Sequence, residues 1–517
     1  MGLLKQVYNG IFNFISMTIR KMQGGLIAAC FLLTQGMLAV LRTKENFEDR
    51  FREEDSPSSG CEDEDMSVDN RGTEIGEWER LPDVCLLHIF KYLNDYDRSK
   101  AALVCHHWHN MMRLPCLWRY RSFYFTGRVS RYKQSEYNVA VGYAKNLGVF
   151  LESLKVTVSP PQSVVLAERL ILTICGLLVT LVRVKAQLKS LSIERLQLDR
   201  SAWGRGLRNN LVDNLIFFLS AGSSRLKVIC LNKIQISMPQ GLNLLSAIIQ
   251  NQSRLYPLCS LNSLDLRSFF SVTVPNHIIP KMYSMLQELR GLSHLYLSYS
   301  CLSDDLLRSL SQSNREKRSS NGRGGNILQS LSLYCSRNEP HQQVVCGYLW
   351  SNLVSNCLDL KVSITVDQIM DTQQLARILL PDIPLVAFSM TAFYTVDPNT
   401  SAKPLLHNLL PCYRHSLQNL KLDLNNQSET LDDELVALVD VCECLVDLSV
   451  WAFLDVLTVG RVLQIRLTKR MSLNNIRMII LTMTENIVGK EEQLVEVLSP
   501  FSYPPQLKFS AAVCPLT

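Results

Sequence analysis

Residues 261–266 read LNSLDL, and the same arrangement of apolar positions returns at 292–297 as LSHLYL. The spacing is apolar-x-x-apolar-x-apolar, and its last two apolar residues alternate as they do in a short strand with one buried face. Other clear copies are LESLKV (151), LKSLSI (188), LKVICL (226), LQSLSL (328), LQNLKL (417) and LVDLSV (445). Weaker copies stand at 357, 383 and 476. The spacing between the starts of consecutive copies ranges from 26 residues (357 to 383) to 38 residues (188 to 226).

Helix-like segments lie between these copies. In SDDLLRSL (303–310) and TLDDELVALVDVC (430–442), a hydroxyl residue and acids precede an apolar run, as at a helix N-terminus. A strand and a helix repeated in this way must stack on their neighbours to bury their apolar faces. We therefore predict an α/β fold in which residues 151–497 form an irregular leucine-rich-repeat solenoid, with repeats longer than the usual ~20–29 residues.

The composition is that of a folded protein from a reducing compartment. Apolar residues make up 47% of the chain, and the net charge is only +6. Lys and Arg are not gathered in a stripe, so we expect no nucleic-acid partner. The 16 cysteines stand mostly alone in apolar runs such as LTICGLL and LKVICL, where a free thiol behaves as a small apolar group. This pattern favours the cytoplasm or the nucleus.

No sequence pattern typical of catalysis or of metal binding appears. Ser, His and Asp residues are scattered, without a nucleophile elbow, a P-loop or a HExxH helix. Cys442 and Cys444 are the closest approach to a zinc-type pair, and the CHHWH run at 105–109 would point in several directions on a helix. We therefore predict no catalytic residues, no metal and no cofactor.

The N-terminal 77 residues differ from the rest of the chain. Residues 1–42 are an apolar leader of uncertain status, in which the 16 residues from Leu26 to Leu41 fall short of the ~20 that span a bilayer. A signal peptide, a membrane anchor and a nonessential leader all remain open, and membrane contact through Leu26 to Leu41 is the less favoured reading. Residues 43–77 are acidic and poor in bulky apolar side chains, which predicts a disordered linker.

Residues 78–124 have a helical pattern of their own. Proline at position 82 stands where the first turn of a helix tolerates its missing N–H. Helical spacing predicts two apolar faces: Val84, Leu87, Phe90 and Leu93 on the first helix, and Leu103, Val104, Trp108 and Met111 on the second. In a unit shorter than ~70–80 residues, the hydrophobic core alone rarely stabilises the fold. The large apolar content of so short a unit therefore predicts a permanent protein partner.

The stretches LPDVCLLHIFKYL (81–93) and DRSKAALVCHHWHNM (97–111) resemble an F-box, the helical motif that docks on the adaptor Skp1. The Leu-Pro opening, the Ile-Phe pair and the Val-Cys-x-x-Trp run carry the resemblance. An F-box followed by leucine-rich repeats implies a non-catalytic substrate receptor of a ubiquitin ligase, with Skp1, cullin and RING subunits as partners. The resemblance implies that Skp1 contacts Leu81, Pro82, Leu87, Ile89, Phe90, Leu93, Leu103, Val104, Cys105 and Trp108.

The strand residues beside the buried leucines are the candidate binding surface for an unknown protein substrate. In a solenoid the strands line the concave face, and residues between the buried positions point away from the core. These residues are Ser190, Ser192, Ser263, Asp265, His294, Tyr296, Asn419, Lys421, Asp447 and Ser449. We expect Ser192, Asp265, His294, Tyr296, Lys421 and Ser449 to contact the substrate.

Residues 125–150 are expected to be a connecting segment, and 498–517 a C-terminal tail. The alternative function is a leucine-rich-repeat interaction scaffold outside the ubiquitin system, tethered to a membrane through the leader. If the leader were a signal peptide, the sequons at Asn251, Asn399 and Asn426 would be available for glycans.

Overall fold

The chain divides into two compact units, Met1–Arg119 and Tyr120–Thr517, in a computed structural model. The predicted leader (1–42) and acidic linker (43–77) lie outside the residues that the structure describes. Those residues are 81–93, 95–129, 134–221, 225–255, 259–271, 279–289, 291–319, 328–337, 345–393, 401–426, 429–483, 487–501 and 504–515.

The described part of the first unit, which we call the helical unit (81–119), contains three short α-helices. They are α3 (Asp83–Lys91), α4 (Asp95–Ala101) and α5 (His106–Met112), followed by the single 3-10 turn η2 (Pro115–Leu117). Pro82 occupies the N-cap of α3, and Asp83 places a carboxylate in the first turn, where the helix dipole favours it. The Cys105 thiol accepts a hydrogen bond from the Trp108 N–H and so caps α5.

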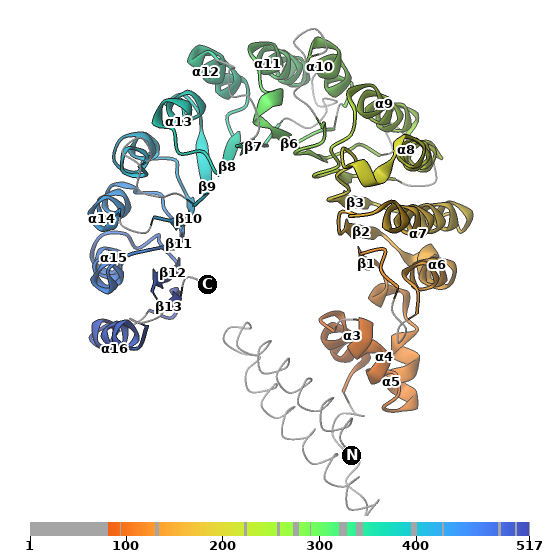
Figure 1. Cartoon of the computed structure of the whole chain (residues 1–517), viewed down its shortest axis with the longest axis horizontal. Helices are drawn as coiled ribbons and strands as arrows, with labels where there is room; N and C mark the ends of the chain where they lie inside the picture. Colours follow the sequence, from red (N-terminus) through yellow and green to blue (C-terminus); the bar gives the residue numbers. More distant parts are fainter. Residues whose placement is uncertain are drawn as a thin grey trace, which may run out of the picture. The chain divides into compact units, whose positions relative to one another are not determined.

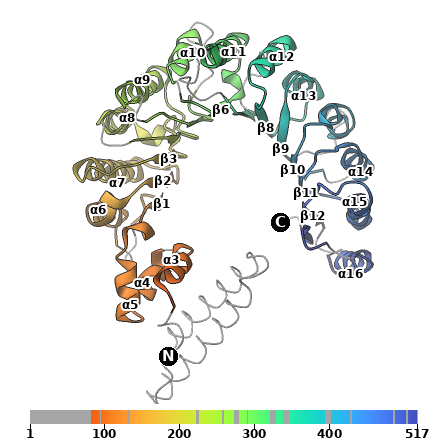
Figure 2. The same cartoon turned by 180° about the vertical axis from the view of Figure 1, so that it is seen from behind.

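The second unit is a solenoid whose sheet has 13 parallel strands in sequence order within the described residues. The predicted solenoid is confirmed. Figures 1 and 2 show the strands along the inner side of the solenoid and the helices along its outer side. The strands are β1 (Tyr120–Phe125), β2 (Ser153–Val158), β3 (Ser190–Glu194), β4 (Val228–Cys230), β5 (Ser263–Leu266), β6 (His294–Ser298), β7 (Ser330–Ser336), β8 (Lys361–Asp367), β9 (Leu385–Phe393), β10 (Asn419–Asn425), β11 (Asp447–Ala452), β12 (Asn475–Thr482) and β13 (Lys508–Pro515).

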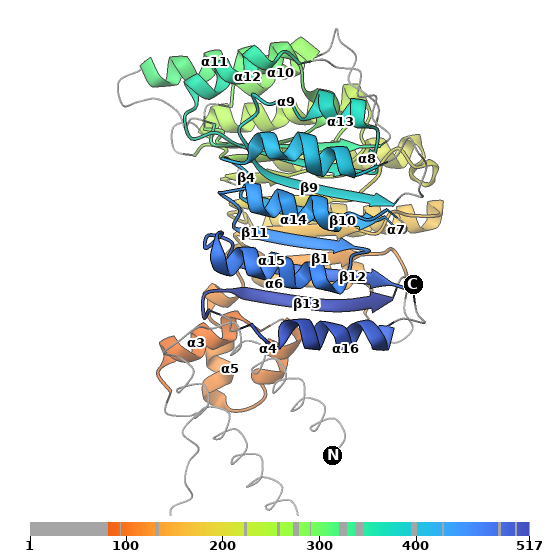
Figure 3. The same ribbon diagram turned by 90° about the vertical axis from the view of Figure 1, so that its left-hand side faces the viewer.

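A helical segment follows each strand but the last and covers the outer face of the sheet (Figure 3). Between β9 and β10 this segment is the π-helical turn η6 (Leu405–Leu409) and the 3-10 turn η7 (Leu410–Tyr413). The α-helices are α6 (Glu136–Leu147), α7 (Val164–Arg183), α8 (Arg205–Ser220), α9 (Met238–Leu255), α10 (Ile279–Gln287), α11 (Asp304–Ser319), α12 (Gly347–Asn356), α13 (Thr372–Ile378), α14 (Asp432–Val441), α15 (Val456–Thr468) and α16 (Ile487–Leu498).

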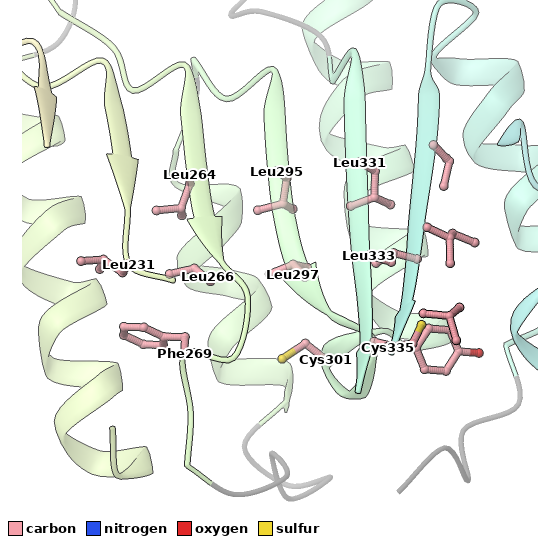
Figure 4. Close-up of a cluster of buried hydrophobic side chains, with 14 of the residues drawn as sticks. Leu231, Leu264, Leu266, Phe269, Leu295, Leu297, Cys301, Leu331, Leu333 and Cys335 are labelled. Atoms are coloured by element: carbon pink, nitrogen blue, oxygen red, sulfur yellow. The ribbon is translucent and has the colours of Figure 1, made fainter. Parts of the chain in front are cut away.

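The leucines of the repeated signature form the core between strands and helices. Figure 4 shows them in two rows across consecutive strands, with Leu264, Leu295 and Leu331 in one row. Leu266, Leu297 and Leu333 make the second row, and all six are at most 2% exposed. Each buried leucine stabilises the fold by about 1.5–3 kcal/mol relative to an exposed one. This repeated burial is why the signature predicts the fold.

The solenoid is longer than the predicted range of 151–497. The expected connecting segment (125–150) contains α6 and follows β1, which pairs in parallel with β2. The expected tail (498–517) contains β13, which pairs with β12 over eight residue pairs. Both predictions are therefore wrong: these segments complete the first and last repeats.

The pairing of the strands is irregular at one place in the described sheet. Between β8 and β9 the register shifts at Val362/Ser363, because Val362 pairs with Leu385 whereas Ser363 pairs with Ala387. The extra residue is Val386, which makes a β-bulge on β9. Beyond the bulge the row of buried side chains continues, because Ile364 pairs with Phe388 and Phe388 pairs with Leu420.

Asn426 ties the ends of two strands together from a fully buried position, at 0% exposure. Its side-chain amide donates to the carbonyl oxygen of Phe453 at 2.9 Å, and its oxygen accepts the Phe453 N–H at 2.8 Å. Asn251, 5% exposed, likewise donates to the Leu219 carbonyl. The expectation that glycans could occupy these two sequons is therefore wrong for the folded chain, and Asn399 lies outside the described residues.

We expect Asn426→Ala to lower the free energy of unfolding of the solenoid by about 1–3 kcal/mol, because it leaves the partly buried Phe453 N–H and carbonyl without their side-chain partner. Thermal unfolding followed by circular dichroism measures the loss. Asn425→Ala is the matched control, since the Asn425 side-chain oxygen is buried without a hydrogen-bond partner among the described residues. Equal melting temperatures for the two variants would contradict the role of Asn426.

Candidate functional sites

The helical unit has a small core of its own. Leu86, Phe90, Met111, Met112 and Leu117 are each at most 5% exposed. The Phe90 ring meets the Trp108 ring edge-on, with centroids 5.0 Å apart, which joins α3 to α5. The core therefore uses the side chains of α3 that point toward α5 and η2.

Arg98 is a buried cation that the sequence analysis did not identify as important. It is 8% exposed and donates to the carbonyl oxygens of Phe90 (3.1 Å), Lys91 (3.1 Å) and Leu117 (2.6 Å). Its guanidinium also lies 5.6 Å from the centroid of the Trp118 ring. Arg98 thus satisfies carbonyls at the end of α3 and in η2, and holds these two elements together.

The helical unit also exposes large apolar side chains. Val84 and Leu103 are each 77% exposed, Val104 is 55% exposed and Tyr92 is 47% exposed. The predicted apolar face of the first helix is therefore wrong in part, because Leu86 rather than Val84 faces the core. Exposed apolar side chains on so small a unit are typical of protein-interaction surfaces.

The residues predicted to contact Skp1 fall into three groups. Leu103, Val104 and Pro82 are exposed. Partly buried residues at the edge of the core are Leu81, Leu87, Ile89, Leu93, Cys105 and Trp108. Phe90 is the exception, since at 1% exposure it supports the fold and has little surface left for a partner.

The second candidate site is the strand face opposite the helices, which we call the strand face. Burial alternates along the strands: in β3, Leu191 and Ile193 are buried, whereas Ser190, Ser192 and Glu194 are partly exposed. The structure places all six predicted substrate residues on strands of this face. Ser192, Asp265, His294 and Tyr296 lie on β3, β5 and β6, and Lys421 and Ser449 lie on β10 and β11. They form two separate groups.

The group on β3–β6 is engaged in internal contacts. Asp265 is 6% exposed and receives hydrogen bonds from the Arg267 guanidinium, the shortest at 2.6 Å. The Arg267 guanidinium lies 5.2 Å from the Tyr296 ring centroid, and Ser192 donates to Glu194 at 2.7 Å. Burial raises the pKa of the neighbouring Cys230 thiol to about 12, so this thiol stays neutral. Asp265 is thus a poor candidate for direct contact with a substrate.

The group on β10–β11 borders a hollow of about 250 Å³ in the strand face. Its lining includes the predicted residues Lys421 and Ser449, together with Asn419 and Asp447. Hydroxyl groups from β8 and β9 also line it, namely Ser363, Thr365 and Ser389, and its remaining lining is apolar: Ile364, Ala387, Phe388 and Leu420. This part of the strand face combines a concave shape with polar side chains from four strands, and it is the stronger candidate for partner binding.

The described residues offer no metal-type cluster and one helix of membrane-spanning length and composition. These residues hold no cluster of three or more His, Cys, Asp or Glu side chains suited to a metal ion. The 14 cysteines that the structure describes are free thiols. One helix, α7, is long and apolar enough to cross a membrane, but half of its most apolar window is buried among the repeats. The burial fits a core helix, and Leu26 to Leu41 lies outside the described residues.

The fold and the helical unit together define an F-box-like helical region followed by a parallel-strand solenoid of the leucine-rich-repeat type. The F-box-like family profile matches residues 78–124. F-box/LRR-repeat protein 21 from Bos taurus is 27% identical over 256 residues, which are 49% of this chain and 53% of that protein. Its Ovis aries counterpart is 25% identical over 236 residues, or 46% of this chain and 49% of that protein. The chain thus spans about half the length of these curated relatives.

Proposed function

We propose that this chain is the substrate-recognition subunit of a Skp1-cullin-F-box ubiquitin ligase. The observation that carries the proposal is the exposed apolar surface of the helical unit, around Leu103 and Val104, in a region that matches the F-box-like family. Exposed apolar surface of this kind is typical of a site that a protein partner covers. Skp1 is the proposed partner, and through it the cullin and RING subunits.

The solenoid would capture the protein substrate on its strand face. The chain's own contribution to ubiquitin transfer would be proximity, because it holds substrate lysines near a conjugating enzyme supplied by the other subunits. We therefore propose a non-catalytic receptor without cofactor, acting in the cytoplasm or the nucleus. LWRYRSFYFTGRVSR (117–131), LKSLSIERLQLDRSAW (188–203) and WAFLDV (451–456) also resemble F-box only protein 39, and we propose that protein as a near relative.

The proposal predicts that docking and substrate capture are separable. A variant with a damaged helical unit should still bind substrates through the solenoid, but those substrates should carry less ubiquitin and should have longer half-lives. The measurement is affinity purification and mass spectrometry from cells in which cullin neddylation is blocked, followed by half-lives of the captured proteins. Unchanged half-lives for every captured protein would instead favour a scaffold outside the ubiquitin system.

A further inference from the structure

The C-terminal strands carry two rows of outward-facing side chains with complementary chemistry. In the first row Lys421 pairs with Ser449, Ser449 with Arg477, and Arg477 with Ser510. The second row, two positions further along each strand, consists of Asp423, Trp451, Ile479 and Ala512. Neighbouring strands lie about 4.8 Å apart, so the backbones of Lys421 and Arg477 are about 10 Å apart, with Trp451 beside the gap between them.

The two cations of the first row are available to a partner. Lys421 and Arg477 are exposed, and within the described part of the chain neither side chain forms an ion pair or hydrogen bond. The nearby carboxylate of Asp447 is different, because it accepts hydrogen bonds from the side-chain amides of Asn419 and Asn475. Its charge is thus partly stabilised by neighbours that are already in place.

The second row offers apolar surface beside those cations. Trp451 is 42% exposed although it stands on a sheet face whose other outward residues on β11 are Asp447 and Ser449. Ile479 on β12 extends this apolar surface and is partly exposed. Exposed tryptophan and arginine side chains that lie close together are typical of the residues that dominate protein-binding energies.

We propose that Lys421, Ser449, Trp451, Arg477 and Ile479, which we call the Trp451 patch, dock an extended peptide segment in which a carboxylate side chain stands beside a large apolar one. The carboxylate would lie between Lys421 and Arg477, and the apolar side chain would cover Trp451 and Ile479. The hollow on β8–β11 shares Lys421 and Ser449 with the patch and provides room for a flanking side chain. This inference rests on the proposed function, since the segment would belong to the substrate.

The local charge favours a carboxylate over a phosphate. Lys421, Arg477 and Lys508 supply three positive charges, and Asp423 and Asp447 supply two negative ones on the same strands. A net charge of one matches a singly charged group. A phosphate carries nearly two negative charges and would meet the carboxylates of Asp423 and Asp447.

The test is a phage library of random dodecapeptides selected on the full chain, with Skp1 binding by the same preparation measured separately. We expect selected peptides to combine Asp or Glu with Leu, Ile, Phe or Trp. Fluorescence polarisation with the selected peptides should show at least tenfold weaker binding to Trp451→Ala and to Lys421→Glu/Arg477→Glu, because these changes remove the apolar contact and reverse the charge. Tyr124→Ala, which removes a 59% exposed aromatic from β1 on the same face, should bind within twofold of the unmodified chain.

Three results would overturn the inference. The first is selected peptides that bind both patch variants as tightly as the unmodified chain. The second is a selection without enrichment of Asp or Glu, and the third is tighter binding when phosphoserine replaces the acidic residue. Unchanged melting temperatures of the two patch variants exclude misfolding as the cause of weaker binding. Co-purification with Skp1 is measured separately. Normal Skp1 binding, with peptides that bind the patch variants as tightly as the unmodified chain, refutes only this inference. Peptide binding at the patch without Skp1 binding refutes the proposed function.

Discussion

Replacing Leu103 and Val104 together by glutamate is expected to weaken Skp1 binding by more than 100-fold while the helical unit stays folded. Both side chains are largely exposed, at 77% and 55%, so their replacement removes little from the unit's own core. In a complex, each lost apolar side chain forfeits about 1.5–3 kcal/mol, and each buried glutamate adds a desolvation penalty. A loss of about 3 kcal/mol is already more than 100-fold in affinity.

Co-purification and titration calorimetry with Skp1 measure this effect. Leu172→Glu is the matched control, because Leu172 is 60% exposed on α7 of the solenoid and the same apolar-to-acidic change there should leave Skp1 binding intact. Retention of Skp1 by the double variant at the level of the control would remove the basis of the proposed docking surface.

Phe90→Ala is expected to unfold the helical unit instead of merely weakening one contact. Phe90 is 1% exposed and packs against Trp108, and truncating a buried phenylalanine costs about 3–5 kcal/mol. A core as small as that of the helical unit supplies about 3–5 kcal/mol in total, so this loss removes most of its stability. Skp1 binding should disappear together with the fold.

Hydrogen exchange distinguishes this result from the first one. Amides of α3 and α5 should lose protection in Phe90→Ala but keep it in the Leu103/Val104 variant. Val84→Ala is the control on the same helix. Because Val84 is 77% exposed, its truncation should change the free energy of unfolding of the helical unit by no more than about 0.5 kcal/mol. Full protection of α5 in Phe90→Ala would show that the ring is not a core residue.

The strands could be predicted because each buries the same positions of the repeated signature. Even the weak copies at 357, 383 and 476 lead into or lie on strands β8, β9 and β12. Strand β1 was missed because Arg121 stands at the position that pairs with Leu154, where the signature has a buried leucine. Strand β13 gives almost no signal, since a terminal strand has one neighbour and buries few of its side chains.

The candidate sites were harder to predict because sequence spacing does not show which apolar stripe faces inward. On α3, Leu86 and Phe90 share one face and Val84 lies about 200° around the helix from Leu86, so only one of the two stripes can face the core. Likewise, alternation placed Asp265 and Lys421 on the strand face. The alternation did not show that Arg267 forms an ion pair with Asp265. Nor did it show that Lys421 forms no ion pair in the described residues.

The sequence-ordered sheet also bears on how the chain acquires its structure during synthesis. In the part of the chain that the structure describes, every strand pairs only with the strand before it and the strand after it along the chain, so its partners are about one repeat away. Folding rates fall when contacts join distant residues, and solenoids largely avoid that entropic penalty. The early repeats can therefore close as they leave the ribosome, before the later ones exist, and a chain stalled after β7 would already present half of its strand face.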